Sequence, residues 1–123
     1  MVEPPKSILV VDDDPNMREL LAIHLRGSGY DVRAAEDCIA AGKALLARTA
    51  DMLIMDVHMP HMDGFEFVAA LNADPAYRHI PVIFLTSEEE GDQRAKGLNA
   101  VGFVRKPVRA DELLAIVAKH LRP

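Results

Sequence analysis

Acidic residues, a hydroxyl and a lysine stand at the ends of four apolar runs. Asp12-Asp13 and Asp56 each follow a run of aliphatic residues, Thr86 ends a third run, and Lys106 follows the last. Three carboxylates gathered in one cleft repel one another, and a hard divalent cation with oxygen ligands relieves that repulsion. A lysine and a hydroxyl beside them suit the oxygens of a transferred phosphoryl group. The residue types therefore indicate Mg²⁺-assisted phosphoryl transfer to an aspartate.

For this chemistry, the four runs must bring their ends to one place. The runs Ser7–Val11, Met52–Met55 and Ile80–Leu85 are almost continuously apolar, which is typical of strands buried on both faces of a parallel sheet. Two further strands are predicted at 30–34 and 102–105. Because ligands of such sheets bind beyond the carboxyl ends of the strands, we expect the polar side chains to converge at that edge.

Helices are predicted between the strands. Asp14 before Pro15 is an N-cap followed by a proline at the first helical position, and Gly27 is expected to close that helix. Helical spacing of apolar residues predicts further helices at 41–45, 65–71 and 111–121, and a weak, glycine-interrupted one at 88–98. The third helix is expected to bury Phe65, Val68, Ala69 and Leu71. Five strands alternating with five helices predict an α/β fold, a doubly wound parallel sheet with helices on both faces.

Composition restricts the classes of function. The 123 residues fit one domain, and we expect a short tail at 1–6 followed by a single domain at 7–123. The net charge of −5 argues against a nucleic-acid-binding surface. No apolar run approaches the roughly 20 residues of a membrane span. The one cysteine, Cys38, cannot form an intramolecular disulfide. We therefore expect a cytoplasmic protein that binds neither nucleic acid nor membrane directly.

Four segments, in this order and at this spacing, resemble the receiver domain of bacterial two-component response regulators. They are Ile8–Pro15 (ILVVDDDP), Asp56–Gly64 (DVHMPHMDG), Ile80–Ser87 (IPVIFLTS) and Lys106–Pro107 (KP). The resemblance covers nearly the whole chain and is to the stand-alone type represented by chemotaxis regulators. It implies the flavodoxin-like strand order 2-1-3-4-5, with the site at the switch between strands one and three.

The resemblance also implies roles for individual residues. Asp56 would accept a phosphoryl group from a histidine kinase or a histidine phosphotransfer protein, making a switch with slow self-dephosphorylation rather than a turnover enzyme. Thr86 and Lys106 would contact the phosphoryl oxygens, and the Lys106-Pro107 peptide bond would be cis, aiming the lysine into the pocket. The implied Mg²⁺ ligands are three side chains and the backbone carbonyl of one further residue: Asp12, Asp13, Asp56 and, through its carbonyl, His58.

Phe103 stands where the family has its switch aromatic, so Thr86 and Phe103 are the implied switch residues. Phosphorylation would then change the surface of the fourth helix, fifth strand and fifth helix, where an unidentified downstream protein binds. Val101 and Gly102 replace an acidic pair that often precedes the aromatic, which argues against a dimer through this surface. Arg109 stands where the last helix more often has an Asp or Ser cap, so we expect its first turn to be weakly anchored.

Several alternatives stay open. A haloacid-dehalogenase-type phosphohydrolase also has an Asp-x-Asp pattern after an apolar strand, which Asp12–Asp14 satisfies, but it leaves Asp56 unused and needs a later acidic strand end. A flavodoxin-like electron carrier would have a hydroxyl- and glycine-rich loop after strand one, where this chain has acids. A pseudo-receiver that only binds partners would not need a complete pocket. His58 and His61 have the spacing of a metal pair, although a site of hard oxygen ligands does not favour imidazole.

Overall fold

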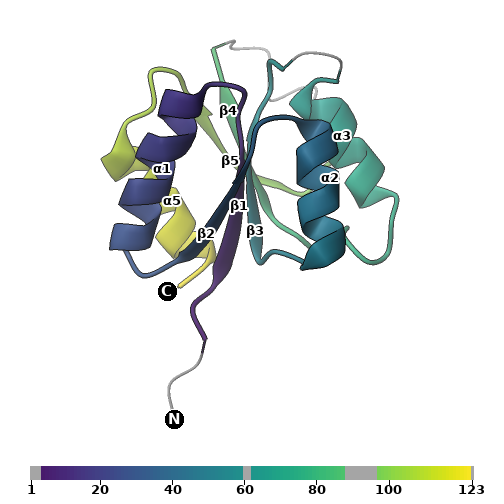
Figure 1. Cartoon of the computed structure of the whole chain (residues 1–123), viewed down its shortest axis with the longest axis horizontal. Coiled ribbons are helices and arrows are strands. Elements are labelled where there is room, and N and C mark those ends of the chain that lie inside the picture. The colour runs from purple at the N-terminus through teal and green to yellow at the C-terminus, as the bar shows by residue number, and fades with distance from the viewer. Residues whose placement is uncertain (1–3, 60–61, 88–96, 123) are drawn as a thin grey trace.

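A five-stranded parallel sheet lies between two layers of helices in the computed structural model (Figure 1). The structure describes residues 4–59, 62–87 and 97–122. The sheet order is β2-β1-β3-β4-β5, which confirms the predicted fold class and strand order. The strands are β1 (Ser7–Val11), β2 (Asp31–Ala35), β3 (Met52–Asp56), β4 (Val82–Thr86) and β5 (Ala100–Arg105).

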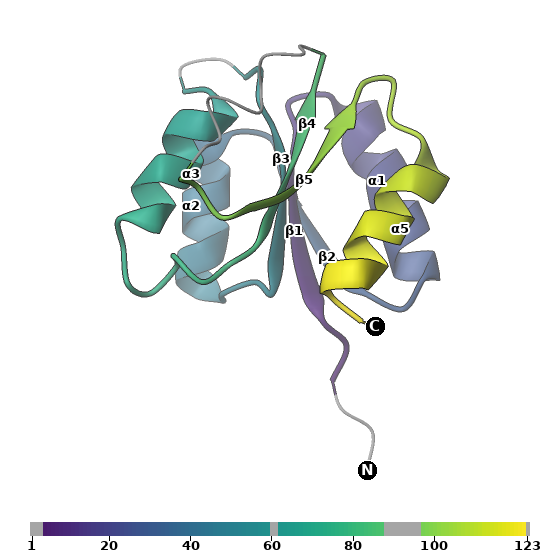
Figure 2. The same cartoon turned by 180° about the vertical axis from the view of Figure 1, so that it is seen from behind.

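The helices cover both faces of the sheet. Figures 1 and 2 show α1 and α5 together on one face and α2 and α3 on the other. Their bounds are α1 (Pro15–Gly27), α2 (Cys38–Ala47), α3 (Gly64–Asn72) and α5 (Ala110–His120). The weak helix predicted at 88–98 falls largely on residues 88–96, which lie outside the described residues. Among the helices that the structure describes, none has the length and apolar character needed to cross a bilayer.

The apolar strands are buried on both sides, as their sequences predicted. Every residue of β1, β3 and β4 is buried. Because successive side chains alternate between the faces of a strand, Leu9 and Val11 pack in the core under α2 and α3. Ile8 and Val10 pack in the second core under α1 and α5. The sheet is therefore a buried central layer whose carboxyl edge carries the polar residues.

Aspartates cap the first turns of three helices at the carboxyl edge of the sheet. The side chains of Asp14, Asp37 and Asp63 accept hydrogen bonds from backbone N–H groups of the first turns of α1, α2 and α3, at 2.9, 2.7 and 2.9 Å. The last helix, α5, starts after Arg109 with no side-chain capping bond, as predicted. Arg109 instead pairs with Asp111 at 3.0 Å on the surface.

The edge strand β5 contains a register shift that the sequence did not reveal. It starts at Ala100, two residues before the predicted start, because Ala100 and Gly102 pair with consecutive residues of β4. Val101 is left as a bulge between them. Since paired residues in a parallel sheet point to the same face, the bulge puts Phe103 beside Phe84 on the α2–α3 side.

The carboxyl end of α2 is capped by Arg33 from β2. Its guanidinium donates to the carbonyls of Ala44, Arg48 and Thr49 at 2.8, 2.7 and 3.0 Å, satisfying helix-end acceptors and complementing the helix dipole. We expect Arg33→Met to lower the free energy of unfolding by about 2 kcal/mol in urea denaturation. The control Arg48→Met removes an exposed pair with Asp31 and should lower it by less than about 0.5 kcal/mol. Equal losses would contradict the capping role.

Candidate acidic site

The residues predicted to do chemistry come together at the carboxyl edge of the sheet. Asp56 and Thr86 are the last residues of β3 and β4, while Asp12 and Lys106 directly follow β1 and β5. Asp12, Asp56 and Thr86 are buried, with exposed fractions of 0%, 1% and 3%. Because β1 and β3 are neighbours at the point where the strand order reverses, their two aspartates lie side by side.

Three carboxylates form a tight cluster. Oxygen atoms of Asp12, Asp13 and Asp56 all lie within 4.8 Å of one another, with Asp13 on the exposed side. One oxygen of each buried acid, Oδ2 of Asp12 and Oδ2 of Asp56, has no hydrogen-bond partner among the described residues. Buried charged oxygens without donors are unfavourable, and an all-oxygen set with room for water suits Mg²⁺. The residues present therefore fit a divalent cation.

Lys106 reaches into the same cluster. Its Nζ lies 3.1 Å from Oδ1 of Asp56 and 3.5 Å from Oδ2 of Asp12. The Lys106-Pro107 peptide bond is cis, as predicted, and the Lys106 N–H donates to the carbonyl of Thr86 at 2.9 Å. Burial lowers the pKa of Lys106, but the two carboxylates outweigh it, and the net pKa is raised. The lysine therefore carries a positive charge in the pocket.

The charge of Asp56 is not fully compensated. Burial, followed by the neighbouring Asp12, raises the pKa of Asp56 to about 6, although Lys106 and the His58 N–H act to lower it. That N–H donates to Oδ1 of Asp56 at 3.3 Å, while the His58 side chain is exposed. The pocket thus holds more negative charge than one lysine offsets. A further cation would stabilise the ionised form of Asp56.

The loop after β3 folds back closely over Asp56. The N–H of Val57 donates to the carbonyl of Leu85 at 3.0 Å, and the N–H of Gly64 donates to the carbonyl of Val57 at 2.9 Å. A Cβ atom on Gly64 would lie 2.5 Å from the backbone oxygen of Asp56, so only glycine fits there without displacement. Gly64 therefore allows the start of α3 to pack directly against the acid.

Arg18 is a residue near the site that the sequence analysis did not single out. Its guanidinium donates to the backbone carbonyl of Asp12 at 2.8 Å. Oδ1 of Asp12 accepts the N–H of Asp14 at 2.9 Å, and the Asp12 N–H donates to Ala35 at 3.2 Å. The sequence pattern gives no signal for this contact, because it depends on the direction in which α1 leaves the sheet.

Phe103 is half-buried and belongs to a row of three rings. It stacks on Phe84 with centroids 5.7 Å apart and planes at 20°, and Phe84 contacts Phe65 at 4.6 Å. Phe84 lies two residues before Thr86 on β4. Phe103 is thus packed against the core and remains partly exposed.

The thiol of Cys38 lies in partly buried surroundings. Cys38 lies at the start of α2, and its Sγ donates to the carbonyl of Met62 at 3.5 Å. Burial, followed by nearby Asp37, Asp63 and Glu66, raises the pKa of Cys38 to about 11, which suits an unreactive thiol. His61 of the alternative metal pair lies outside the described residues.

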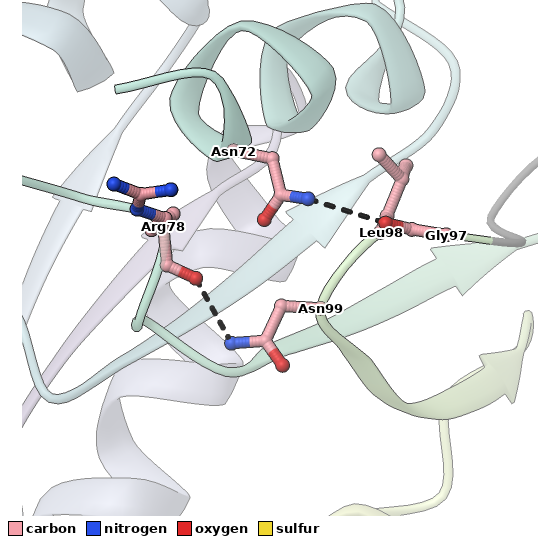
Figure 3. Close-up of a pocket in the computed structure, with 5 residues that line it drawn as sticks. All are labelled: Asn72, Arg78, Gly97, Leu98 and Asn99. Carbon is pink, nitrogen blue, oxygen red and sulfur yellow. Dashed lines mark hydrogen bonds between the residues drawn. The ribbon is translucent and has the colours of Figure 1, made fainter. Parts of the chain in front are cut away.

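A hollow of about 300 Å³ lies at the opposite edge of the sheet, between the end of α3 and the start of β5 (Figure 3). It is lined by Asn72, Arg78, Gly97, Leu98 and Asn99. The Asn72 amide donates to the Gly97 carbonyl at 3.2 Å, and the Asn99 amide to the Arg78 carbonyl at 3.4 Å. These amides tie loops together, and the hollow is separate from the acidic site.

The chain is similar to known proteins over nearly its whole length. The family model of the response regulator receiver domain matches residues 8–118. The chain is 34% identical over 119 residues to the phosphate regulon transcriptional regulatory protein PhoB of Pseudomonas aeruginosa, covering 95% of this chain and 52% of PhoB. It is 36% identical over 117 residues to the DNA-binding response regulator MtrA of Mycolicibacterium smegmatis, covering 94% of this chain and 50% of MtrA.

The chain therefore spans about half the length of these curated relatives. A solved structure of the chemotaxis protein CheY4 of Vibrio cholerae superposes with a TM-score of 0.88 at 34% identity. That match covers 95% of this chain and 99% of CheY4. With the family model, the relatives and the strand order in agreement, the chain belongs to the family of response regulator receiver domains.

Proposed function

We propose that Asp56 is the phosphoacceptor of this receiver domain and takes its phosphoryl group from a histidine kinase or a histidine phosphotransfer protein. Accepting a phosphoryl group is the general function of the family to which the chain belongs. One observation carries the assignment to Asp56. It is a carboxylate with 1% exposure whose Oδ1 lies 3.1 Å from Nζ of Lys106, against 3.5 Å for Asp12, and accepts the N–H of His58.

The proposed reaction forms a mixed anhydride. A carboxylate oxygen of Asp56 forms a bond to phosphorus, the phosphorus–nitrogen bond of the donor histidine breaks, and its electron pair stays on the imidazole. Lys106 and the hydroxyl of Thr86 orient the phosphoryl oxygens and offset their charge. Water later attacks the phosphorus, the bond between phosphorus and the Asp56 oxygen breaks, and inorganic phosphate leaves the free Asp56 carboxylate.

The Mg²⁺ of this site would be held by residues at the carboxyl ends of β1 and β3. The proposed ligands are the side chains of Asp12, Asp13 and Asp56 and the backbone carbonyl of His58. Bound there, Mg²⁺ would offset the negative charge that gathers when a phosphoryl group enters a pocket of three carboxylates. Oδ2 of Asp56, which is buried and has no hydrogen-bond partner among the described residues, supports this proposal.

The test uses phosphoramidate as a small-molecule donor, with Mg²⁺ or with a chelator. We expect one phosphoryl group per wild-type chain in Mg²⁺, detected by mass spectrometry and lost in base or hydroxylamine. In the chelator, labelling should fall at least about tenfold. Asp13→Asn should show slow labelling and a smaller rise of melting temperature with Mg²⁺. Equal labelling in chelator, or an unchanged Mg²⁺ effect in Asp13→Asn, would show that the assigned metal site is wrong.

We propose further that Thr86 and Phe103 transmit the phosphorylated state to the surface of β5 and α5, where an unidentified downstream protein binds. Thr86 ends the strand that carries Phe84, and Phe84 stacks on Phe103. Drawing the Thr86 hydroxyl towards a phosphoryl group would move the end of β4 against that ring. The phosphoryl group thereby shifts a population between two packings of Phe103. MtrA is named as a DNA-binding protein, but the net charge of −5 argues against DNA binding by the residues of this chain.

Amide hydrogen exchange tests this linkage. On phosphorylation, we expect exchange to change mainly at residues 97 to 105, with little change in α1 and α2. In Thr86→Ala the change should shrink by more than about half, because the hydroxyl no longer follows the phosphoryl group. Phe103→Ala should be labelled at Asp56 at a normal rate but lose the response in β5. A response confined to α1 and α2 would contradict the proposed route.

A further inference from the structure

Arg18 of α1 reaches back six residues to the loop that carries two of the clustered acids. One guanidinium nitrogen donates to the backbone carbonyl of Asp12 at 2.8 Å. The Arg18 backbone N–H makes the ordinary helical bond to Asp14 at 3.0 Å. The side chain is therefore an extra tie between the second turn of the helix and the peptide unit just after β1.

That peptide unit joins Asp12 to Asp13. The carbonyl of the first residue and the N–H of the second share one plane, whose two ends are the Cα atoms of the two acids. Holding the carbonyl direction therefore restrains the backbone angles that aim both side chains. Asp12 is also fixed by its N–H bond to Ala35 and by the Asp14 N–H on its Oδ1. Asp13 is exposed, so packing contributes little to its orientation.

We propose that Arg18 is a positioning residue for the cation site. By holding the peptide unit between Asp12 and Asp13, it keeps both carboxylates within 4.8 Å of each other and of Asp56. The inference rests on the proposed Mg²⁺ site and adds a residue to it. Arg18 would make no contact with the cation and would act through the backbone, as residues behind the ligands of metal sites commonly do.

The sign of the effect separates positioning from simple charge. A guanidinium beside a cation site repels the cation, so an Arg18 that acted only as a charge would weaken Mg²⁺ binding, and its removal would tighten it. An Arg18 that positions the acids does the opposite: its removal loosens the cluster and weakens binding.

The same helix supplies a matched control. Arg26 of α1 also donates to a backbone carbonyl six residues away, that of Val32, at 2.8 Å. Val32 lies in β2, remote from the acids. Arg18→Met and Arg26→Met therefore remove the same kind of bond from the same helix, and only Arg18→Met removes it from the acidic loop.

Isothermal titration of the metal-free protein with Mg²⁺ alone measures the effect. We expect Arg18→Met to raise the Kd about tenfold and Arg26→Met to leave it within about twofold, while both lower the melting temperature by similar amounts. Arg18→Lys keeps the charge and one donor and should lie between wild type and Arg18→Met. A Kd that stays the same or falls in Arg18→Met, or rises equally in Arg26→Met, would overturn the proposal.

Two further measurements keep the result decisive. If Arg18→Met does not fold, the Arg18→Lys titration and the amide resonance of Asp13 replace it. That resonance should shift or broaden in metal-free Arg18→Lys and stay unchanged in Arg26→Met. Asp13→Asn distinguishes the inference from the site on which it rests. If it abolishes binding while Arg18 variants bind normally, only the role of Arg18 is wrong; if it binds like wild type, the metal site is wrong as well.

Discussion

Asp56→Asn is expected to abolish phosphorylation of the chain, with labelling by phosphoramidate in Mg²⁺ falling below about one hundredth of the wild-type rate. Asparagine has the same shape, but its amide is a poor nucleophile and a weak cation ligand. Asp56 is the buried acid in contact with both Lys106 and the His58 N–H, so no neighbouring carboxylate occupies an equivalent position. Mass spectrometry of intact and digested protein measures both the extent and the position of the label.

The fold should tolerate this substitution. Asp56→Asn removes one of two adjacent buried negative charges, so the melting temperature of the metal-free protein should not fall below that of wild type. The matched control is Asp111→Asn, an exposed aspartate at the start of α5, which should be labelled normally. Label that persists in Asp56→Asn and maps to Asp12 would favour the haloacid-dehalogenase-type phosphohydrolase over the phosphorylation switch.

The strands that carry the site could be predicted because each is a continuous run of apolar residues. Buried parallel strands need continuous apolar runs, and the polar residue that ends each run marks the carboxyl edge. Asp12, Asp56 and Thr86 were therefore placed correctly from the sequence. The sequence pattern of an outer helix does not determine which side chain it buries. In α3, Phe67 is buried where Ala69 was expected, because the small Ala69 points to solvent and the larger ring fills the core.

Three features of the site could not be predicted, because each depends on tertiary contacts. The bulge at Val101 changes which face Phe103 occupies, yet one extra residue in a strand leaves no mark in an apolar pattern. The bond from Arg18 to Asp12 depends on how α1 leaves the sheet. Gly27 ends α1, as predicted, but the positive φ of 99° that turns the chain towards β2 belongs to Gly29.

Gly64→Ala is expected to destabilise the protein by about 3 kcal/mol, a large effect for one methyl group. The added Cβ would lie 2.5 Å from the backbone oxygen of Asp56, 3.0 Å from Cγ of Met55 and 3.1 Å from Cα of Val57. Two of these atoms belong to the backbone and cannot turn away like the end of a flexible side chain. Relief requires α3 or the end of β3 to move, so the acidic cluster should also lose Mg²⁺ affinity.

Gly42→Ala supplies the opposite case within the same chain. Gly42 lies in the middle of α2, and a Cβ there would meet nothing within 4 Å. Alanine has the higher helix propensity and narrows the unfolded ensemble, so this variant should gain about 0.5–1 kcal/mol. Urea denaturation of both variants measures the two changes, and Mg²⁺ titration should show weaker binding in Gly64→Ala alone. If both alanines raised stability alike, the close contact between α3 and Asp56 would not exist in solution, and the glycine after Asp63 would have no part in placing the acid.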